Sequence, residues 1–266
     1  AGFCTAGGLR PILGQSEPIQ NSLGFTIGYS LGEQRTSYIT PQFEPQVKVS
    51  DKGMIQVKIP IVFIYGELGN SQGLGDVILT YNHQFDSLWK QKISLTVGTR
   101  IGTGTSSFKI DDIALPMPYQ RSLGTTDLIL GAKIFFKKGF SLSVGFQQPL
   151  VNINQNGFDS SAFYQVASNY DLKPEDNYFI SSNLKRKGDL MLRIDKSFEW
   201  KKRFISVGIL PIYHLGKDVA SISKGQETKI EGSQGLTLNI NASIAHKISS
   251  KCEISSTVAV PLIVRD

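Results

Sequence analysis

The feature that most constrains this chain is a long two-residue alternation of apolar and small polar side chains. Residues 92–101 are an example, with one apolar face and one polar face: Ile93, Leu95, Val97 and Ile101 against Ser94, Thr96, Gly98 and Arg100. The same period recurs in 140–146 and 236–244. A period of two predicts β-strands. The runs extend for about 10 to 13 residues, which is longer than the five or six usual in soluble sheets.

The alternating segments follow a repeated hairpin pattern. Each repeat has a glycine, often an aspartate, an alternating strand, a short turn that usually contains lysine, and a second strand. Three repeats carry the aspartate, as Asp76, Asp127 and Asp189. We therefore expect eleven strands, which span residues 23–31, 40–50, 54–65, 73–85, 92–101, 124–136, 140–150, 187–198, 203–215, 236–248 and 252–264.

The connections alternate between short turns and long polar loops, the longest being 102–125, 151–187 and 216–234. Aromatic residues gather near both strand ends: Phe85, Trp89, Phe136, Phe140, Phe198, Trp200 and Phe204 at the short turns, and Tyr29, Tyr65, Phe146 and Tyr213 near the long loops. Short turns at one rim, long loops at the other and two aromatic bands are typical of outer-membrane barrels. The sequence predicts an all-β, antiparallel transmembrane β-barrel of about 12 strands.

Two parts of the chain are expected. Residues 1–22 carry several glycines and prolines, and we expect a non-strand segment that plugs the barrel or lies in the periplasm; residues 23–266 form one barrel. Bacterial barrels normally have an even number of strands. Either a twelfth strand is missing from this sequence, or the N-terminal segment closes the sheet. We favour a natural protein of twelve strands, which the intact mass of the mature protein tests.

Composition removes other classes of protein. The chain of 266 residues is 40% hydrophobic, which argues against disorder. It has no apolar run of the roughly 20 residues that a membrane helix needs. The net charge of +6 is scattered in small clusters, such as Lys137–Lys138 and Lys201–Arg203, that fall in turns. Because no nucleic-acid-binding motif accompanies these clusters, we expect no nucleic-acid partner.

The sequence offers little catalytic chemistry. Gly28–Gly32 matches the Gly-x-Ser-x-Gly elbow of hydrolases, but no amphipathic helix follows it. The three histidines, His83, His214 and His246, have no partner at metal-ligand spacing. We expect no enzyme activity, no cofactor and no metal. A barrel enzyme remains a third alternative.

Charged residues on the polar face are the main candidates for function. By alternation they are Glu44, Lys48, Lys58, Arg100, Lys133, Arg193, Asp195 and Glu253. A cation on the lipid face would cost about 2–4 kcal/mol at the midplane, so these side chains should line the lumen. There they either pair and fill the barrel or line a selective water path. Cys4 and Cys252 could form a disulfide, because the compartment is oxidising.

Two short motifs carry a family resemblance: Gly-Leu-Gly-Asp at Gly73–Asp76 and Cys-Thr-Ala-Gly-Gly at Cys4–Gly8. With the hairpin repeat, they make the chain resemble outer-membrane barrels of Bacteroidota-type bacteria. These barrels are loosely related to the transporter-like channels for fatty acids and aromatic compounds. The resemblance implies an outer-membrane location, with outer-membrane lipid around the barrel. It fixes no substrate.

We expect a passive channel or conduit for small solutes. The alternative is a non-transporting, structural or accessory barrel subunit of a larger outer-membrane complex. Its partner surface would be the 151–187 loop, which is rich in aromatic residues: Phe158, Phe163, Tyr164, Tyr170, Tyr178 and Phe179.

Overall fold

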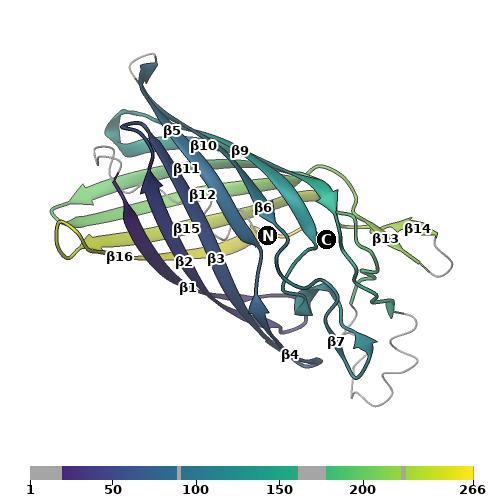
Figure 1. Ribbon diagram of the computed structural model, residues 1–266. Helices are drawn as coiled ribbons and strands as arrows, with labels where there is room; N and C mark the ends of the chain where they lie inside the picture. Colours follow the sequence, from purple (N-terminus) through teal and green to yellow (C-terminus); the bar gives the residue numbers. More distant parts are fainter. Residues whose placement is uncertain (1–19, 89–90, 161–177, 223–225, 266) are drawn as a thin grey trace.

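The computed structural model describes residues 20–88, 91–160, 178–222 and 226–265, whose long strands form one curled antiparallel sheet (Figure 1). The eleven long strands pair in chain order, each antiparallel to the next. They are β1 (Ser22–Leu31), β2 (Ser37–Lys48), β3 (Gly53–Gly66), β5 (Val77–Leu88), β6 (Gln91–Ile101), β9 (Thr125–Phe135), β10 (Phe140–Asn152), β11 (Asp189–Trp200), β12 (Arg203–His214), β15 (Gly235–Lys247) and β16 (Glu253–Ile263). The prediction of eleven antiparallel strands is confirmed.

Shorter elements lie at the end of the barrel that carries the long loops. They are β4 (Gly69–Leu74), β7 (Lys109–Ile110), β8 (Ile113–Ala114), the 3-10 helix η1 (Met117–Tyr119), β13 (Val219–Ser221) and β14 (Glu227–Lys229). β7–β8 and β13–β14 are separate two-stranded sheets. At the other end, η2 (Lys137–Gly139) forms the turn between β9 and β10. Among the described residues, no helix has the length and apolarity needed to cross a membrane.

The largest difference in a strand boundary from the sequence prediction is at Gly73; the other boundaries agree within three residues. The strand expected from Gly73 is divided: β4 pairs with the loop-side half of β3, and β5 begins at Val77 and pairs with the other half. Gly73 allows this because its φ is +145° and a Cβ there would lie 1.8 Å from the Nη1 atom of Arg121. Arg121 also donates a hydrogen bond to the carbonyl of Gln72, which fixes the loop that follows β6 against β4.

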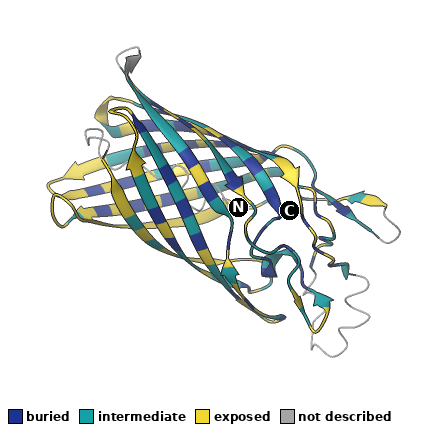
Figure 2. Ribbon diagram, in the orientation of Figure 1, coloured by how far each residue is buried: buried dark blue, intermediate teal, exposed yellow. Residues whose placement is uncertain are grey.

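Buried and more exposed residues alternate along the strands (Figure 2), and their polarity is inverted relative to that of a soluble protein. Outward side chains in the middle of the sheet are apolar and exposed, as at Val97, Leu130 and Val207. Inward side chains are polar and buried, as at Thr96 and Ser206. Exposed apolar side chains need a solvent other than water, because burial in an apolar environment is what stabilises them. The fold therefore has the outward apolar face and polar interior of a transmembrane barrel.

The aromatic bands are confirmed in part. Tyr29, Tyr65 and Tyr213 are exposed at the loop side, and Phe198 and Trp200 are exposed near the short turns. Phe204 is an exception, because it is buried while its neighbour Ile205 faces outward. Trp89 lies outside the described residues.

The sheet has an open seam between β1 and β16. These are the two edges of the sheet, and neither pairs with another described strand on its outer side. No residue of either strand is buried. Ile27 of β1 is 67% exposed and Val258 of β16 is 61% exposed, against 48% for Val97 in the middle of the sheet. A twelfth strand stays a prediction, and β1 and β16 are the edges with which it would pair.

The loops build a small apolar core of their own. Its fully packed members are Ile64, Leu68, Leu115, Tyr119, Phe158 and Tyr178. The Tyr119 hydroxyl accepts a hydrogen bond from the Leu68 backbone at 3.1 Å and lies 3.3 Å from the Tyr178 hydroxyl. This core holds the 102–124 loop and both described ends of the 151–187 loop against the loop-side end of β3.

Candidate functional site

Six of the eight predicted lumen-lining residues are buried inside the barrel: Glu44, Lys58, Arg100, Lys133, Arg193 and Asp195. On the wall formed by β2 and β3, the Lys58 ammonium lies 4.0 Å from the Glu44 carboxylate. The side-chain amide of Gln56 donates a hydrogen bond to the same carboxylate at 3.3 Å. These inward charges are thus paired where the two strands lie side by side.

A second ion pair lies on β11. The Arg193 Nε donates to both oxygens of Asp195, at 3.0 and 2.8 Å, and the Asn241 amide donates to Asp195 at 3.2 Å. Gly208 on β12 makes room for this carboxylate, because a Cβ there would lie 2.4 Å from the Asp195 Oδ1 atom. Lys133 on β9 lies over the ring of Phe135, with its Nζ 4.8 Å from the centroid.

The other two candidates do not reach the interior. Lys48 ends β2 and its ammonium pairs with Asp51 in the next turn at 2.6 Å. Glu253 begins β16 and is exposed. Both are at alternating positions that face the interior elsewhere in their strands. They lie at the short-turn rim, however, and are exposed there. Cys252 is exposed at the same rim. Cys4 and residues 1–19 of the expected 1–22 plug segment lie outside the described residues, and Ser22 already belongs to β1.

The strongest inward ion pair lies near the loop side. The Arg100 guanidinium is 2.6 Å from Asp127 and 3.8 Å from Asp76. Register places Arg100 of β6 directly opposite Asp127 of β9. The Thr125 hydroxyl accepts a further hydrogen bond from Arg100 at 3.0 Å. Burial raises the pKa of Asp76, in the connection between β4 and β5, although Ser122 and Arg100 oppose the rise.

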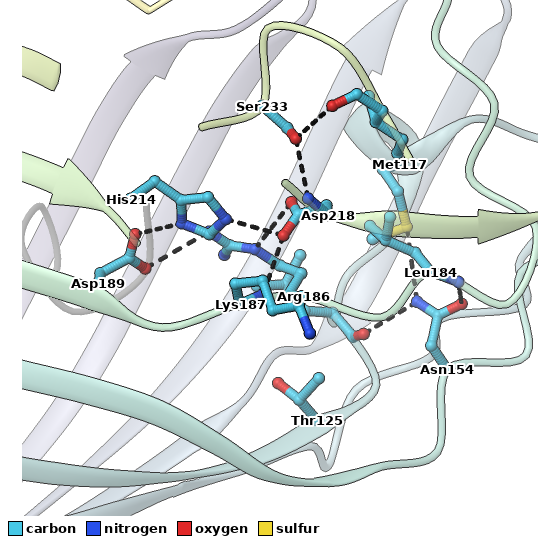
Figure 3. Close-up of polar contacts among 12 residues, drawn as sticks. Met117, Thr125, Asn154, Leu184, Arg186, Lys187, Asp189, His214, Asp218 and Ser233 are labelled. Carbon is cyan, nitrogen blue, oxygen red and sulfur yellow. Dashed lines mark hydrogen bonds and ion pairs between the residues drawn. The ribbon is translucent and has the colours of Figure 1, made fainter. Parts of the chain in front are cut away.

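Beside this pair lies a buried histidine between two carboxylates (Figure 3). His214, the last residue of β12, has no exposed surface. Its Nδ1 is 2.7 Å from Asp189 and its Nε2 is 2.8 Å from Asp218. A neutral imidazole donates from only one ring nitrogen, whereas the imidazolium donates from both. Since each ring nitrogen faces a carboxylate oxygen, the geometry favours the protonated ring.

Arg186 joins the two carboxylates on their other side. Its guanidinium is 3.4 Å from Asp189 and 3.7 Å from Asp218. We call the whole set the loop-side charge network: Asp76, Arg100, Asp127, Arg186, Asp189, His214 and Asp218. With the histidine protonated, four carboxylates face three cations.

The network also fastens the loops. The backbone N–H of Lys187 donates to the Asp218 carboxylate at 2.9 Å, and the backbone N–H of Asp218 donates to the Ser233 hydroxyl at 2.9 Å (Figure 3). Burial alone would raise the pKa of Asp218, but the hydrogen bond from His214 and the charge of Arg186 outweigh it and lower that pKa. The 215–234 loop is therefore tied to the end of β11 through one ionised carboxylate.

A neutral junction lies next to the network. The Asn154 side chain donates to the Leu123 carbonyl at 2.9 Å and accepts from the Leu184 backbone at 3.1 Å. This one amide bridges the 102–124 loop and the two ends of the 151–187 loop (Figure 3). Sequence analysis did not predict it, because an isolated asparagine in a long loop carries no periodic signal.

Of the members of the network, sequence analysis predicted only Arg100 as an inward residue, although the sequence contained one further signal. The aspartate of the hairpin repeat occurs as Asp76, Asp127 and Asp189, and all three are members. Each follows a glycine within three residues and stands at the loop-side start of its strand or just before it. A repeated charged residue in an alternating strand is thus a marker of an inward ion pair.

A curled antiparallel sheet with an apolar outer face and an ion-paired interior defines the class of transmembrane β-barrels. The chain is similar in fold to a solved outer membrane channel from Pseudomonas putida F1, with a TM-score of 0.58 and 11% sequence identity. That similarity covers 94% of this chain and 91% of the channel. No family model and no curated protein matches the chain.

Proposed function

We propose that this protein is a bacterial outer-membrane β-barrel that acts as a narrow passive conduit for small polar solutes. The observation that carries the proposal is the inversion of its surface. The outer face offers apolar side chains to lipid, and the interior offers polar groups to water and to solutes. The similar fold of a solved outer membrane channel supports the same conclusion.

The interior wall has polar side-chain atoms to which water can form hydrogen bonds. Ser143, Ser206 and Asn241 each have a buried side-chain oxygen with no hydrogen-bond partner among the described residues. Buried polar atoms are normally satisfied, by protein or by ordered water. A hydrated wall of small polar residues suits a polar solute better than an apolar one, and it needs no cofactor and no catalytic group.

The loop-side charge network is the candidate for a selective step. Its ion pairs lie inside the loop end of the barrel, where a solute would pass beside them. Removing a cation from it should widen the path and leave carboxylates that favour cations. The solute and the bacterial group, including the Bacteroidota-type resemblance, stay predictions.

Single-channel conductance in a planar lipid bilayer tests the conduit. We expect small discrete steps from the purified protein, and larger, more cation-selective steps from Arg100→Ser, because Asp127 and Asp76 then lose their cation. Arg35→Ser is the matched control, since Arg35 pairs with Glu67 at the exposed loop surface, 3.1 Å away. Electrophoretic heat-shift in detergent verifies that each variant is folded.

Silence from folded, inserted protein would contradict the conduit and favour the second candidate, a non-transporting accessory subunit. The burial of the interior charges is the observation that favours this alternative. Of the aromatic residues of its predicted partner surface in the 151–187 loop, Phe163, Tyr164 and Tyr170 lie outside the described residues. Phe158 and Tyr178 pack into the loop core, and of the described aromatic residues of this loop only Phe179 is exposed. Co-purification of a stoichiometric partner would support the accessory role.

A further inference from the structure

The short-turn end of the barrel carries an unbalanced positive charge. Each described turn there presents exposed lysine, and we call these residues the basic rim: Lys52, Lys137, Lys138, Lys201, Lys202 and Lys251. Among the described turn residues 49–52, 136–139, 201–202 and 248–252, Asp51 is the one acidic residue, and it pairs with Lys48. Glu199 and Glu253, at the strand ends beside these turns, are also exposed, so the six lysines of the rim outnumber three carboxylates among the described side chains.

The loop side differs, because several of its exposed cations pair with carboxylates and further carboxylates, Asp111 and Asp112 among them, are exposed there. Lys185 pairs with Glu227, Lys217 pairs with Glu231, and Arg35 pairs with Glu67. Among the described residues, the short turns therefore carry a more one-sided positive charge than the loop side does.

The basic rim borders the apolar outer face directly. Lys196 of β11 points outward, and its Nζ lies 4.3 Å from the centroid of the Phe140 ring and 5.3 Å from that of Phe198. The same ammonium donates a hydrogen bond to the carbonyl of Lys138 in the neighbouring turn. A long stem along apolar surface with its charge directed to the rim is the arrangement of a lysine at a membrane interface. The rim is therefore at the height of lipid headgroups.

We propose that the basic rim is a binding surface for the phosphate headgroups of anionic phospholipids. The proposal rests on the membrane location given above. The lysines stand on separate hairpins, β2–β3, β9–β10, β11–β12 and β15–β16, spread along the sheet. Lipid contacts a barrel from all sides, whereas an acidic protein would need its cations gathered in one patch. The ring-like spread therefore favours lipid.

Trp200 provides a local probe of this surface. It is 62% exposed, faces outward in phase with Phe198, and directly precedes Lys201 and Lys202. The chain has two tryptophans, so Trp89→Phe leaves Trp200 as the single emitter. The full chain carrying this substitution is reconstituted into phosphatidylcholine vesicles. Part of the lipid is then replaced by brominated phosphatidylglycerol or by brominated phosphatidylcholine, and quenching of Trp200 is compared.

We expect the anionic lipid to be enriched about fivefold over phosphatidylcholine beside Trp200 at low salt. The enrichment should fall to about onefold in Lys201→Ser/Lys202→Ser and in 0.5 M salt, at roughly a 3–5 Å screening length. Lys185→Ser/Lys217→Ser, on the loop side, is the matched control and should keep the enrichment. Heat-shift verifies that all variants are folded.

The outcomes separate this inference from the proposed function. Equal quenching by the two lipids overturns the lipid-binding rim while leaving the barrel in the membrane, and it would direct the search to an acidic protein partner. Enrichment that persists in Lys201→Ser/Lys202→Ser also overturns it, because the lysines would then not be its cause. Absence of quenching by either lipid contradicts the membrane location itself.

Discussion

Replacing His214 with leucine should destabilise the protein by removing the bridge between two buried carboxylates. The imidazole ring joins Asp189 at 2.7 Å and Asp218 at 2.8 Å and has no exposed surface. Leucine is similar in volume but donates no hydrogen bond. The two carboxylates would then share the single guanidinium of Arg186, which lies farther from both, at 3.4 and 3.7 Å.

The expected size follows from the bonds removed. A hydrogen bond to a charged group contributes about 1.5–3 kcal/mol, so two of them set a ceiling of about 3–6 kcal/mol. Arg186 remains, and Asp189 keeps access to water, since its side chain is 18% exposed. We therefore expect a loss of about 3 kcal/mol, the lower end of what breaking a buried ion pair costs.

Equilibrium unfolding in urea, followed by tryptophan fluorescence of protein in lipid vesicles, measures this loss. His246→Leu is the matched control, because His246 on β15 faces outward and is exposed. The difference between wild type and His214→Leu should be largest below about pH 6.5, the ordinary imidazole pKa, and should decline as the ring loses its proton at higher pH. A change below 0.5 kcal/mol at acidic pH, or one equal to that of His246→Leu, would refute the reasoning.

Other predictions test other parts of the barrel. Leu130→Arg on the outer face should cost about 2–4 kcal/mol in the same unfolding assay, whereas an unchanged free energy would argue against lipid there. Gly208→Val should destabilise the barrel by more than about 1 kcal/mol, because its side chain would collide with Asp195 and the Ile194 carbonyl; wild-type stability would show that the pair shifts freely. Because the pKa of Asp218 is lowered, its hold on the 215–234 loop should be complete above about pH 4 and lost as the pH falls through the lower folded-state value. Cleavage of the 215–234 loop by pepsin, compared between wild type and Asp218→Asn, measures how firmly Asp218 holds the loop at each pH. Identical cleavage of the two proteins at every pH would contradict this role of Asp218. Mass spectrometry of mature protein from outer membranes should give a mass above 29.2 kDa if a twelfth strand follows β16, and a matching mass would exclude that strand.

Alternation in the sequence was sufficient to predict the strands and the side of the wall that most residues face. It placed Arg100 and Arg193 inward, and both are buried there. It failed for Lys48 and Glu253 at the short-turn rim. Alternation tells which side of the sheet a side chain faces, but not whether the residue lies in the middle of the strand or at its end. It also misplaced Phe204, which was grouped with the rim aromatics by position although its phase is inward.

The partners of the interior charges could not be read from the sequence. The pair of Arg100 and Asp127 depends on the register between β6 and β9, which are joined by a long loop. The pairing of His214 with Asp218 depends on how the following loop turns back into the barrel. Such contacts depend on how the loops fold in three dimensions. The two-residue alternation contains no information about the conformation of the loops.

The open seam also limits how copies of the protein can associate. β1 and β16 both run from the short turns toward the long loops, because they are the first and the eleventh of the long strands and consecutive strands are antiparallel. Copies inserted with the same orientation in one membrane therefore offer each other only edges of the same polarity. Edge-to-edge stacking into a ribbon would require parallel ladders, which are slightly less stable per residue than the antiparallel ones that build the rest of the wall. The directionality of the strands thus discourages side-by-side polymerisation through the two edges of the described sheet.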